Sequence, residues 1–367
     1  MGPPTPQALE ALLGAGARVE QLEPLAPWSV ARGRVRMGDG STASLIVKWL
    51  REHPQGLRTD IRQIATERAA LEFLAELGFA RAPRLIAADH AAGLLVIEDL
   101  APRTPLDARL RAEGLAGLEA EMLDYARCLG ELGAATAGRA GRYEAMRAAY
   151  GPVDPSTRER GFGSEWPQVS KRLATLGLTI ADGVERELAR ILSLLESPGA
   201  FLTFTNGDTQ VNNFLVGEGE GRLIDYEAAG FRHALSAAVL IHMPGSAFMT
   251  VRAPLCVELE RAYREALAVG VPQATDDRLF GAGMAGACLA FALDRLTRFA
   301  LLDSRPAGHE SRIQMISTLE SAATAARGHR AFPRTAGWAD RAAEWLRRRW
   351  PDADLDLDSY APYSPRV

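Results

Sequence analysis

The sequence predicts an α+β fold in two lobes, a small β-rich N-terminal lobe and a large, mostly helical C-terminal lobe. Two observations predict it. Short β-type runs and one helical pattern share the first hundred residues, whereas long helical patterns dominate after Pro105. A length of 367 residues with 47% hydrophobic residues suffices for a sizeable core. We expect an N-lobe at 1–97, a hinge at 98–105, a helical C-lobe at 106–350 and an acidic, extended tail at 351–367.

The N-lobe pattern alternates strands with helical segments. From the N-terminus it predicts a helix at 7–15, strands at 30–37 and 43–49, a helix at 59–77, and strands at 83–88 and 94–97. The sequence Gly38-Asp39-Gly40-Ser41 between the first two strands is typical of a hairpin turn. The apolar residues at helical spacing stop at Gly78, which predicts the end of the longer helix.

The C-lobe pattern is helical with one exception. It predicts helices at 106–137, 184–197, 255–268, 279–302, 310–327 and 337–349. The exception is a β-rich stretch at 200–227, which also holds most of the polar residues of chemical interest.

Composition excludes several classes of protein. The formal net charge of −4 argues against nucleic acid as an obligate partner. The three cysteines lie far apart and without paired spacing, so we expect reduced thiols. The N-terminus has no basic stretch followed by an apolar core, so we expect no secretory signal. Charged residues or glycine interrupt the apolar stretches before about 18 residues, so we expect no membrane span and a cytoplasmic location.

Lysine is rare in this chain. Of the 42 basic residues only Lys48 and Lys171 are lysines. A chain that prefers arginine but keeps a lysine indicates a place where a compact charge on a slim stem is needed. Chance retention stays open for Lys171.

The segment 201–230 reads FLTFTNGDTQVNNFLVGEGEGRLIDYEAAG. An apolar strand leads to Asp208, and Asn213 precedes a second apolar strand. A glycine-rich turn and a short apolar pair then lead to Asp225 and Glu227. This order predicts a hairpin with a loop on its entry side, which brings Asp208, Asn213 and Asp225 together.

These residue types suit phosphoryl transfer, which needs charge neutralisation and in-line positioning more than covalent help. A carboxylate and an amide oxygen, from Asp225 and Asn213, are ligands that Mg²⁺ accepts. A separate carboxylate, Asp208, can orient an acceptor hydroxyl and take its proton.

The segment resembles the H-G-D-x4-N and D-F-E motifs of the aminoglycoside phosphotransferase and choline kinase superfamily, whose fold is bilobal and protein-kinase-like. The resemblance implies catalytic and metal loops at 203–230, with Asp208 as the base and Asn213 and Asp225 as ligands of Mg²⁺. It also implies ATP or another NTP as cofactor and a small-molecule hydroxyl as acceptor. Glu227 matches the second acidic residue of the D-F-E motif.

The same resemblance implies nucleotide-binding residues in the N-lobe. Lys48 would contact the α- and β-phosphates and pair with Glu67, with Glu72 and Glu76 as competing partners. The main chain of Glu98, Asp99 and Leu100 would bind the adenine edge. The turn from Pro24 to Val30 would cover the phosphates, and Ser29 would donate a hydrogen bond to one of them.

Three departures from the family pattern stand out. Asn206 replaces the usual histidine, Ala237 stands where an aspartate would brace the catalytic loop, and no G-x-G-x-x-G lies near the start. They leave an alternative, a weak or inactive nucleotide-binding pseudokinase with a regulatory or binding role. The lysine, the base and both metal ligands are all present, so we expect an active phosphotransferase.

Four further features of the sequence bear on the substrate and on possible binding sites. No dense acidic run precedes the tail, so a polycationic aminoglycoside is not the implied acceptor, whereas a sugar, an amino alcohol or another hydroxylated metabolite stays open. The arginine-rich segment 139–160 is either a substrate-binding region or, by default, a solvated face. We expect Arg347 to Arg349 to form a solvated helix end. His233 and His242 lack metal-ligand spacing, which favours a polar or packing role.

Overall fold

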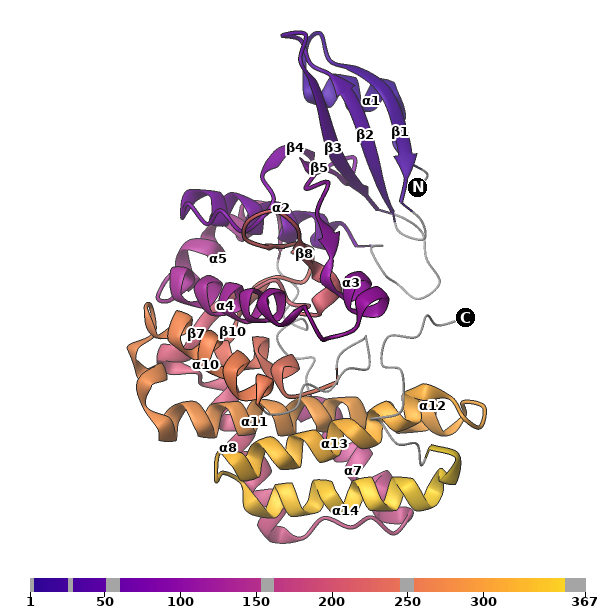
Figure 1. The fold of residues 1–367 in the computed structure, drawn as a ribbon, viewed down its shortest axis with the longest axis vertical. Helices are drawn as coiled ribbons and strands as arrows, with labels where there is room; N and C mark the ends of the chain where they lie inside the picture. Colours follow the sequence, from indigo (N-terminus) through magenta and orange to yellow (C-terminus); the bar gives the residue numbers. More distant parts are fainter. Residues whose placement is uncertain (1–2, 26–28, 51–59, 153–161, 245–253, 354–367) are drawn as a thin grey trace.

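The computed structural model describes residues 3–25, 29–50, 60–152, 162–244 and 254–353. An antiparallel sheet with two helices forms one end of the molecule, and a stack of helices forms the other (Figure 1). The predicted bilobal α+β fold is therefore confirmed. The two lobes meet around the short strands and loops of the segment 202–233.

The N-lobe sheet has five strands in the order β1-β2-β3-β5-β4. Their bounds are β1 Arg18–Pro24, β2 Val30–Arg36, β3 Thr42–Trp49, β4 Leu85–Asp89 and β5 Leu94–Glu98. The predicted hairpin turn joins β2 to β3, where the Met37 amide donates to the Ser41 carbonyl at 2.7 Å. The sequence missed β1, because none of its residues is buried and its few apolar residues give no clear alternation.

One helix lies on each face of this sheet. Helix α1 (Pro6–Leu13) begins at the cap Thr5 and packs Leu9 against apolar side chains of β2, β3 and β5. Helix α2 (Ile61–Glu76) begins at the cap Asp60, whose side chain accepts from the Arg62 amide at 2.9 Å. It buries Ile64, Leu71 and Leu74 in the large core that continues into the C-lobe.

The C-lobe contains most of the helices. They are α3 Leu106–Glu113, α4 Glu119–Thr136, α5 Ala140–Ala148, α7 Phe162–Thr175, α8 Asp182–Glu196, α9 Ala234–Ala237, α10 Leu255–Ala268, α11 Asp277–Leu296, α12 Phe299–Asp303, α13 Glu310–Gly328 and α14 Pro333–Arg349. The single helix expected at 106–137 is two helices, because Gly114 has φ +79° and ends α3. The helix expected at 279–302 likewise divides into α11 and α12.

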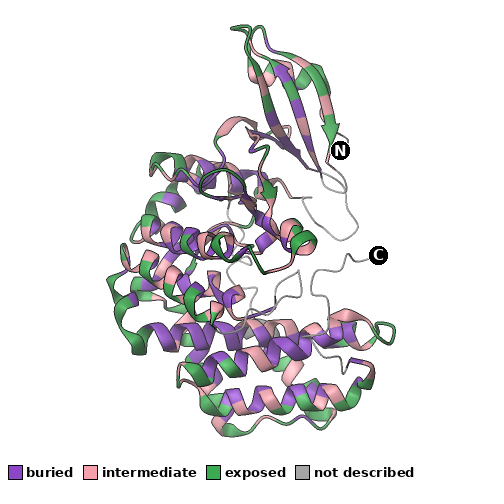
Figure 2. Cartoon of the chain, in the orientation of Figure 1, coloured by how far each residue is buried: buried purple, intermediate pink, exposed green. Residues whose placement is uncertain are grey.

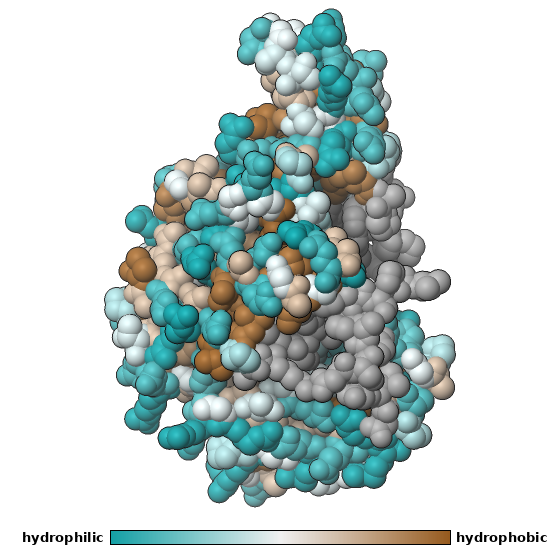
Figure 3. Space-filling view, viewed as in Figure 1, coloured by the Kyte–Doolittle hydropathy of each residue, from teal (hydrophilic) through white to brown (hydrophobic). Residues whose placement is uncertain are grey.

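Helix α11 is the central helix of the C-lobe (Figure 2). By length and composition it is apolar enough to cross a membrane, contrary to the interruptions expected from the sequence. However, 72% of its apolar window is buried inside the protein, as in the core helix of a globular lobe. The face of the molecule seen in Figure 3 is mainly hydrophilic, with apolar residues scattered over it.

Small residues let the C-lobe helices approach closely. A Cβ at Gly130 of α4 would lie 2.4 Å from the Tyr263 carbonyl of α10, so only glycine fits there. The close packing of α4 and α10 supports strand β7 (Leu202–Thr205), because the Thr136 hydroxyl of α4 accepts a hydrogen bond from the Phe204 amide at 3.0 Å. These helices thus hold the strand that leads into the candidate catalytic loop.

His233 couples the stability of this region to pH. Its ring stacks on Phe201 at 5.3 Å, and its Nδ1 accepts from the Leu235 amide at 3.3 Å. Burial lowers the pKa of His233 to about 4, whereas the unfolded chain takes the proton near pH 6.5. This stabilising contribution is therefore complete above pH 6.5 and is lost as the pH falls to 4.

We expect His233→Asn, which keeps a cap acceptor but does not titrate, to flatten this dependence. The free energy of unfolding of the wild type should fall between pH 7 and 4 by roughly 3 kcal/mol more than that of the variant. Urea unfolding of both proteins across this range measures the difference. Parallel pH curves for the two proteins would contradict it.

Candidate active site

The loop that carries Asp208 lies between β7 (Leu202–Thr205) and the 3₁₀ turn η2 (Val211–Asn213). Two side-chain amides shape this loop by donating hydrogen bonds to the same main-chain carbonyl. Asn206 Nδ2 donates to the Asp208 carbonyl at 2.8 Å, and Asn213 Nδ2 donates to the same oxygen at 3.0 Å. Asn206 Nδ2 also donates to the Ile224 carbonyl at 3.0 Å. The fully buried Asn206 therefore ties the Asp208 loop to the segment of Asp225.

Gly207 brings the loop against the far side of the same segment. Its φ is +87°, and a Cβ there would lie 2.1 Å from the Ala228 carbonyl. Both its conformation and its close approach require glycine.

We expect Gly207→Ala to lower the free energy of unfolding by about 3 kcal/mol or more, because the methyl group collides with main chain as well as straining φ. Gly219→Ala is the matched control, since Gly219 has φ +71° with nothing within 4 Å. That variant should lose only about 1 kcal/mol. Equal losses in the two variants, measured by urea unfolding, would show that the loop does not lie against Ala228.

Asp225 follows the second half of the predicted hairpin. Strand β8 (Phe214–Val216) pairs with β9 (Arg222–Leu223), and the Ile224 amide donates to the Asn213 carbonyl at 2.9 Å. This pairing places Asp225 next to Asn213, as the sequence predicts. The φ of Asp225 is +65°, and it is one of three non-glycine residues with positive φ in the described part of the chain. Such backbone strain is often found at functional sites.

Lys48 joins the two lobes at this point. Its Nζ lies 2.5 Å from Glu67 Oε1 and 2.8 Å from Asp225 Oδ1. The Lys48 side chain is 8% exposed and that of Glu67 is 1% exposed, so this ion-pair network is buried. The Tyr226 amide also faces Glu67 Oε1, at 3.4 Å. One ammonium group thus connects β3, α2 and the segment that follows β9.

Helix α5 determines which glutamate of α2 faces Lys48. The competing Glu72 accepts from the Tyr150 hydroxyl at 2.5 Å, and Glu76 pairs with Arg142 at 2.5 Å. Buried Arg147 donates to Thr66 Oγ1 at 3.0 Å. Its two other guanidinium nitrogens each donate to a main-chain carbonyl. These contacts fix the rotation of α2 so that Glu67 points inward.

Over its described part, segment 139–160 is in part the solvated face expected by default, since Arg139 and Arg142 are exposed, but it also packs against α2. Arg142, Arg147 and Tyr150 contact α2, and Tyr143 packs on Phe204 at 4.8 Å. The remainder of the segment, from residue 153, lies outside the described residues. This packing role could not be predicted, because the pattern of an amphipathic helix does not reveal which element its arginines contact.

Asp208 is exposed to solvent, but protein surrounds much of its carboxylate. This partial burial is the main cause that raises the pKa of Asp208 above its ordinary value. The nearby carboxylate of Asp225 is the second cause. Hydrogen bonds from Gln210 and Asn213 act in the opposite direction. A carboxylate that substrate can reach, with a raised pKa, is suited to accept a proton.

The residues around Asp225 fit a hard cation. Carboxylate oxygens of Glu67, Asp225 and Glu227 lie within 4.8 Å of one another. Asn213 turns its amide nitrogen to the Asp208 carbonyl, so its oxygen is available as a ligand, and Asn212 Nδ2 donates to that oxygen at 2.9 Å. A donor set of carboxylate and amide oxygens is typical of Mg²⁺ sites.

Most of the residues expected to bind the nucleotide in the N-lobe lie in the described part of the chain. The side chain of Ser29 is buried, and its carbonyl accepts from the Trp49 amide at 3.1 Å, which places it beside Lys48. The Glu98 amide donates to the Arg84 carbonyl at 2.9 Å, and the Leu100 carbonyl accepts from the Arg103 amide at 3.0 Å. These two main-chain groups are thus already paired within the chain. Residues 26–28 of the expected phosphate-covering turn lie outside the described part.

The hinge carboxylates also make structural contacts, a role that the sequence did not indicate. Glu98 connects the lobes, since it accepts from Arg222 of β9 at 3.2 Å. Asp99 ties the hinge to the N-lobe sheet, since it accepts from Arg32 at 2.8 Å and from Ser44 at 2.5 Å. Buried Arg81 donates across the lobes to the Gly221 carbonyl at 3.0 Å and pairs with carboxylates of α4.

The bracing of the Asp208 loop accommodates the departures from the family motif. Ala237 ends helix α9 and offers no side-chain hydrogen bond, but Tyr125 donates its hydroxyl to the Thr209 carbonyl in the same loop. Tyr125, Asn206 and Asn213 thus each donate a hydrogen bond to a main-chain carbonyl of this loop.

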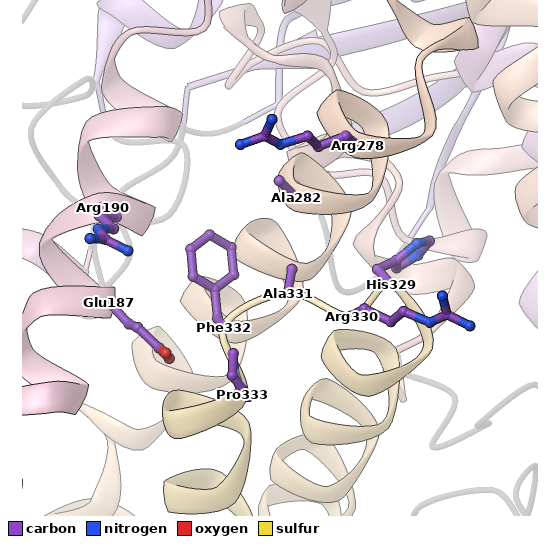
Figure 4. Close-up of a pocket in the computed structure, with 9 residues that line it drawn as sticks. All are labelled: Glu187, Arg190, Arg278, Ala282, His329, Arg330, Ala331, Phe332 and Pro333. Atoms are coloured by element: carbon purple, nitrogen blue, oxygen red, sulfur yellow. The ribbon is translucent and has the colours of Figure 1, made fainter.

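Two cavities among the described residues are lined by residues other than Asp208, Asn213 and Asp225. One, of about 360 Å³, lies between α8, α11 and the loop before α14 (Figure 4). Arg330 and Phe332 in that loop have φ of +54° and +50°. The other, of about 600 Å³, lies between α4 and α10.

No protein-family model matches the chain, and no curated protein matches it. Similar solved structures are small-molecule kinases. A choline/ethanolamine kinase family protein from Mesorhizobium loti is 17% identical with a TM-score of 0.49, and covers 88% of this chain and 92% of its own. An ethanolamine kinase from Plasmodium vivax is 12% identical with a TM-score of 0.48, covering 84% and 82%. An amicoumacin kinase is 16% identical with a TM-score of 0.45, covering 83% and 89%.

The first of these proteins is a member of the choline/ethanolamine kinase family, and the Asn206–Glu227 motif resembles motifs of the superfamily that includes choline kinases. At such identities and TM-scores the likeness assigns no role to any residue of this chain.

Proposed function

We propose that this protein transfers the γ-phosphate of ATP, or of another NTP, to a hydroxyl group of a small molecule. The observation that carries the proposal is the contact of Lys48 with both Glu67 and Asp225 across the two lobes, at 2.5 and 2.8 Å. An ammonium group held there is in place to contact nucleotide phosphates. The Asp208 loop, tied to the same segment through Asn206 and Asn213, then faces the transferred group.

In this proposal each residue has one task. Asp208 orients the acceptor hydroxyl and accepts its proton, because its raised pKa makes it a better base than an aspartate of ordinary pKa. Asn213 and Asp225 hold Mg²⁺, which when bound neutralises the charge of the phosphates. Ser29 and the main chain of residues 98–100 contact the nucleotide. The cytoplasmic location expected from the sequence stays a prediction.

Two measurements on the full chain test the proposal. We expect ATP to raise the Tm in a thermal shift assay, and to raise it further with Mg²⁺. We also expect ADP release to increase with some members of a panel of sugars, amino alcohols and other hydroxylated metabolites. No shift with any NTP would contradict nucleotide binding. A shift without acceptor-dependent ADP release would instead support the pseudokinase alternative.

A further inference from the structure

A second group of ionisable side chains lies in the C-lobe, on elements other than those that carry Asp208, Asn213 and Asp225. His242 follows the 3₁₀ turn η3 (Val239–Ile241), Glu260 lies on α10, and His329 ends α13. His242 Nε2 lies 2.7 Å and His329 Nε2 lies 2.9 Å from the same oxygen of Glu260. The donor atoms of all three lie within 4.8 Å of one another. We call these residues the His-Glu-His cluster.

Cys256 lies against the second nitrogen of His242. Its Sγ is 3.3 Å from His242 Nδ1 and 3.5 Å from the Ile241 carbonyl. In the tautomer whose Nδ1–H donates to this sulfur, Nε2 presents its lone pair to Glu260. A lone pair facing a carboxylate oxygen repels it unless a cation lies between them. That cation is either a proton or a metal ion.

We propose that the His-Glu-His cluster binds a divalent transition-metal ion, with Zn²⁺ as the best fit. Two imidazole nitrogens and a carboxylate are a donor set of zinc sites, with water as a fourth ligand. Ligands about 2.0–2.2 Å from Zn²⁺ in a tetrahedron lie about 3.3 Å apart, so each His–Glu260 separation must widen by only about half an ångström. Hydrogen bonding of the second nitrogen of a ligating histidine, here by Cys256, is a regular feature of such sites.

The surroundings allow an ion to enter and the rings to adjust. The side chains of His242, Glu260 and His329 are 13%, 18% and 18% exposed, so the cluster reaches solvent. Gly281 of α11 leaves space beside the His329 ring, since a Cβ there would lie 3.2 Å from Nδ1. Bound metal would connect η3, α10 and α13, and through η3 the segment that follows β10 (Gly230–His233) and α9.

Calorimetric titration of the chelator-treated full chain with Zn²⁺ tests this site. Millimolar Mg²⁺ in the buffer occupies oxygen-rich sites such as that near Asp225. We expect one Zn²⁺ per chain and a zinc-dependent rise in Tm. Glu260→Gln and His329→Gln should each lower the affinity about a hundredfold or more, and Cys256→Ser about tenfold. Glutamine at position 329 can still donate to Glu260, so this variant removes the ligand while keeping a hydrogen bond.

His309→Asn is the matched control. His309 caps α13 at its other end, where asparagine is also a good cap, and it should leave zinc binding unchanged. Equal zinc affinity in the wild type and His329→Gln, or no stoichiometric binding, would overturn the proposal and leave the cluster as a proton-linked clamp. If Glu260→Gln fails to fold, as circular dichroism would show, the comparison of His329→Gln with His309→Asn decides. The outcome is independent of nucleotide binding and of phosphoryl transfer.

Discussion

Replacing Lys48 by methionine is expected to lower the free energy of unfolding by about 3–5 kcal/mol. The ammonium group of Lys48 contacts Glu67 and Asp225 in a buried position, and methionine has a similar stem without the charge. The two carboxylates then lose the cation between them, which costs more than the pair contributed. Urea unfolding measures the loss, and ATP should no longer raise the Tm of the variant.

Two further variants separate this effect from a general loss of packing. Lys171, the other lysine of the chain, is exposed on α7, and Lys171→Met should change stability by less than about 0.5 kcal/mol. Adding Glu67→Gln to Lys48→Met removes one uncompensated charge and should recover part of the loss. If Lys48→Met is as stable as Lys171→Met, the contact between the lobes does not form as described.

Asp208→Asn is expected to lower turnover about 10²- to 10⁴-fold while nucleotide binding is retained. Asn206 and Asn213 donate to the main-chain carbonyl of Asp208, so the substitution leaves these two hydrogen bonds in place. Asparagine keeps the size of the side chain but cannot accept the proton of the acceptor hydroxyl. Acceptor-dependent ADP formation measures turnover, and the ATP-dependent Tm shift measures binding.

A matched substitution makes this result specific. Asp182 is exposed in the first turn of α8, and Asp182→Asn should leave turnover unchanged. Turnover by Asp208→Asn equal to that of the wild type would remove Asp208 from the chemistry. A loss of both turnover and the Tm shift would indicate a disturbed loop instead.

The geometry around Lys48 was predictable because its sequence signals were local. A lysine that is rare in the chain ends a β-type run, and a helix with suitably spaced glutamates follows. The hairpin with Asn213 and Asp225 was also readable, since its glycine-rich turn and apolar strands are adjacent in sequence. Which of Glu67, Glu72 and Glu76 pairs with Lys48 could not be predicted, because the answer depends on α5 and the residues after it, more than sixty residues later in the chain.

Other features could not be predicted from the sequence, for similar reasons. Strand β1 has no buried residue, so neither apolar alternation nor burial marked it. The His-Glu-His cluster joins positions 18 and 69 residues apart on three elements, and no spacing rule covers such distances. For His233, however, the expected packing role is confirmed, since its ring stacks on Phe201 and caps α9.

The measurement that tests the proposed function most directly follows the phosphate itself. The wild-type chain is incubated with Mg²⁺, ATP labelled at the γ-phosphate and each candidate acceptor, and the products are analysed by mass spectrometry. We predict that at least one hydroxylated acceptor gains the labelled phosphoryl group with the wild type and not with Asp208→Asn. If no acceptor gains it from any NTP, or if both proteins transfer it equally, the assignment of phosphoryl transfer to the Asp208 loop is contradicted.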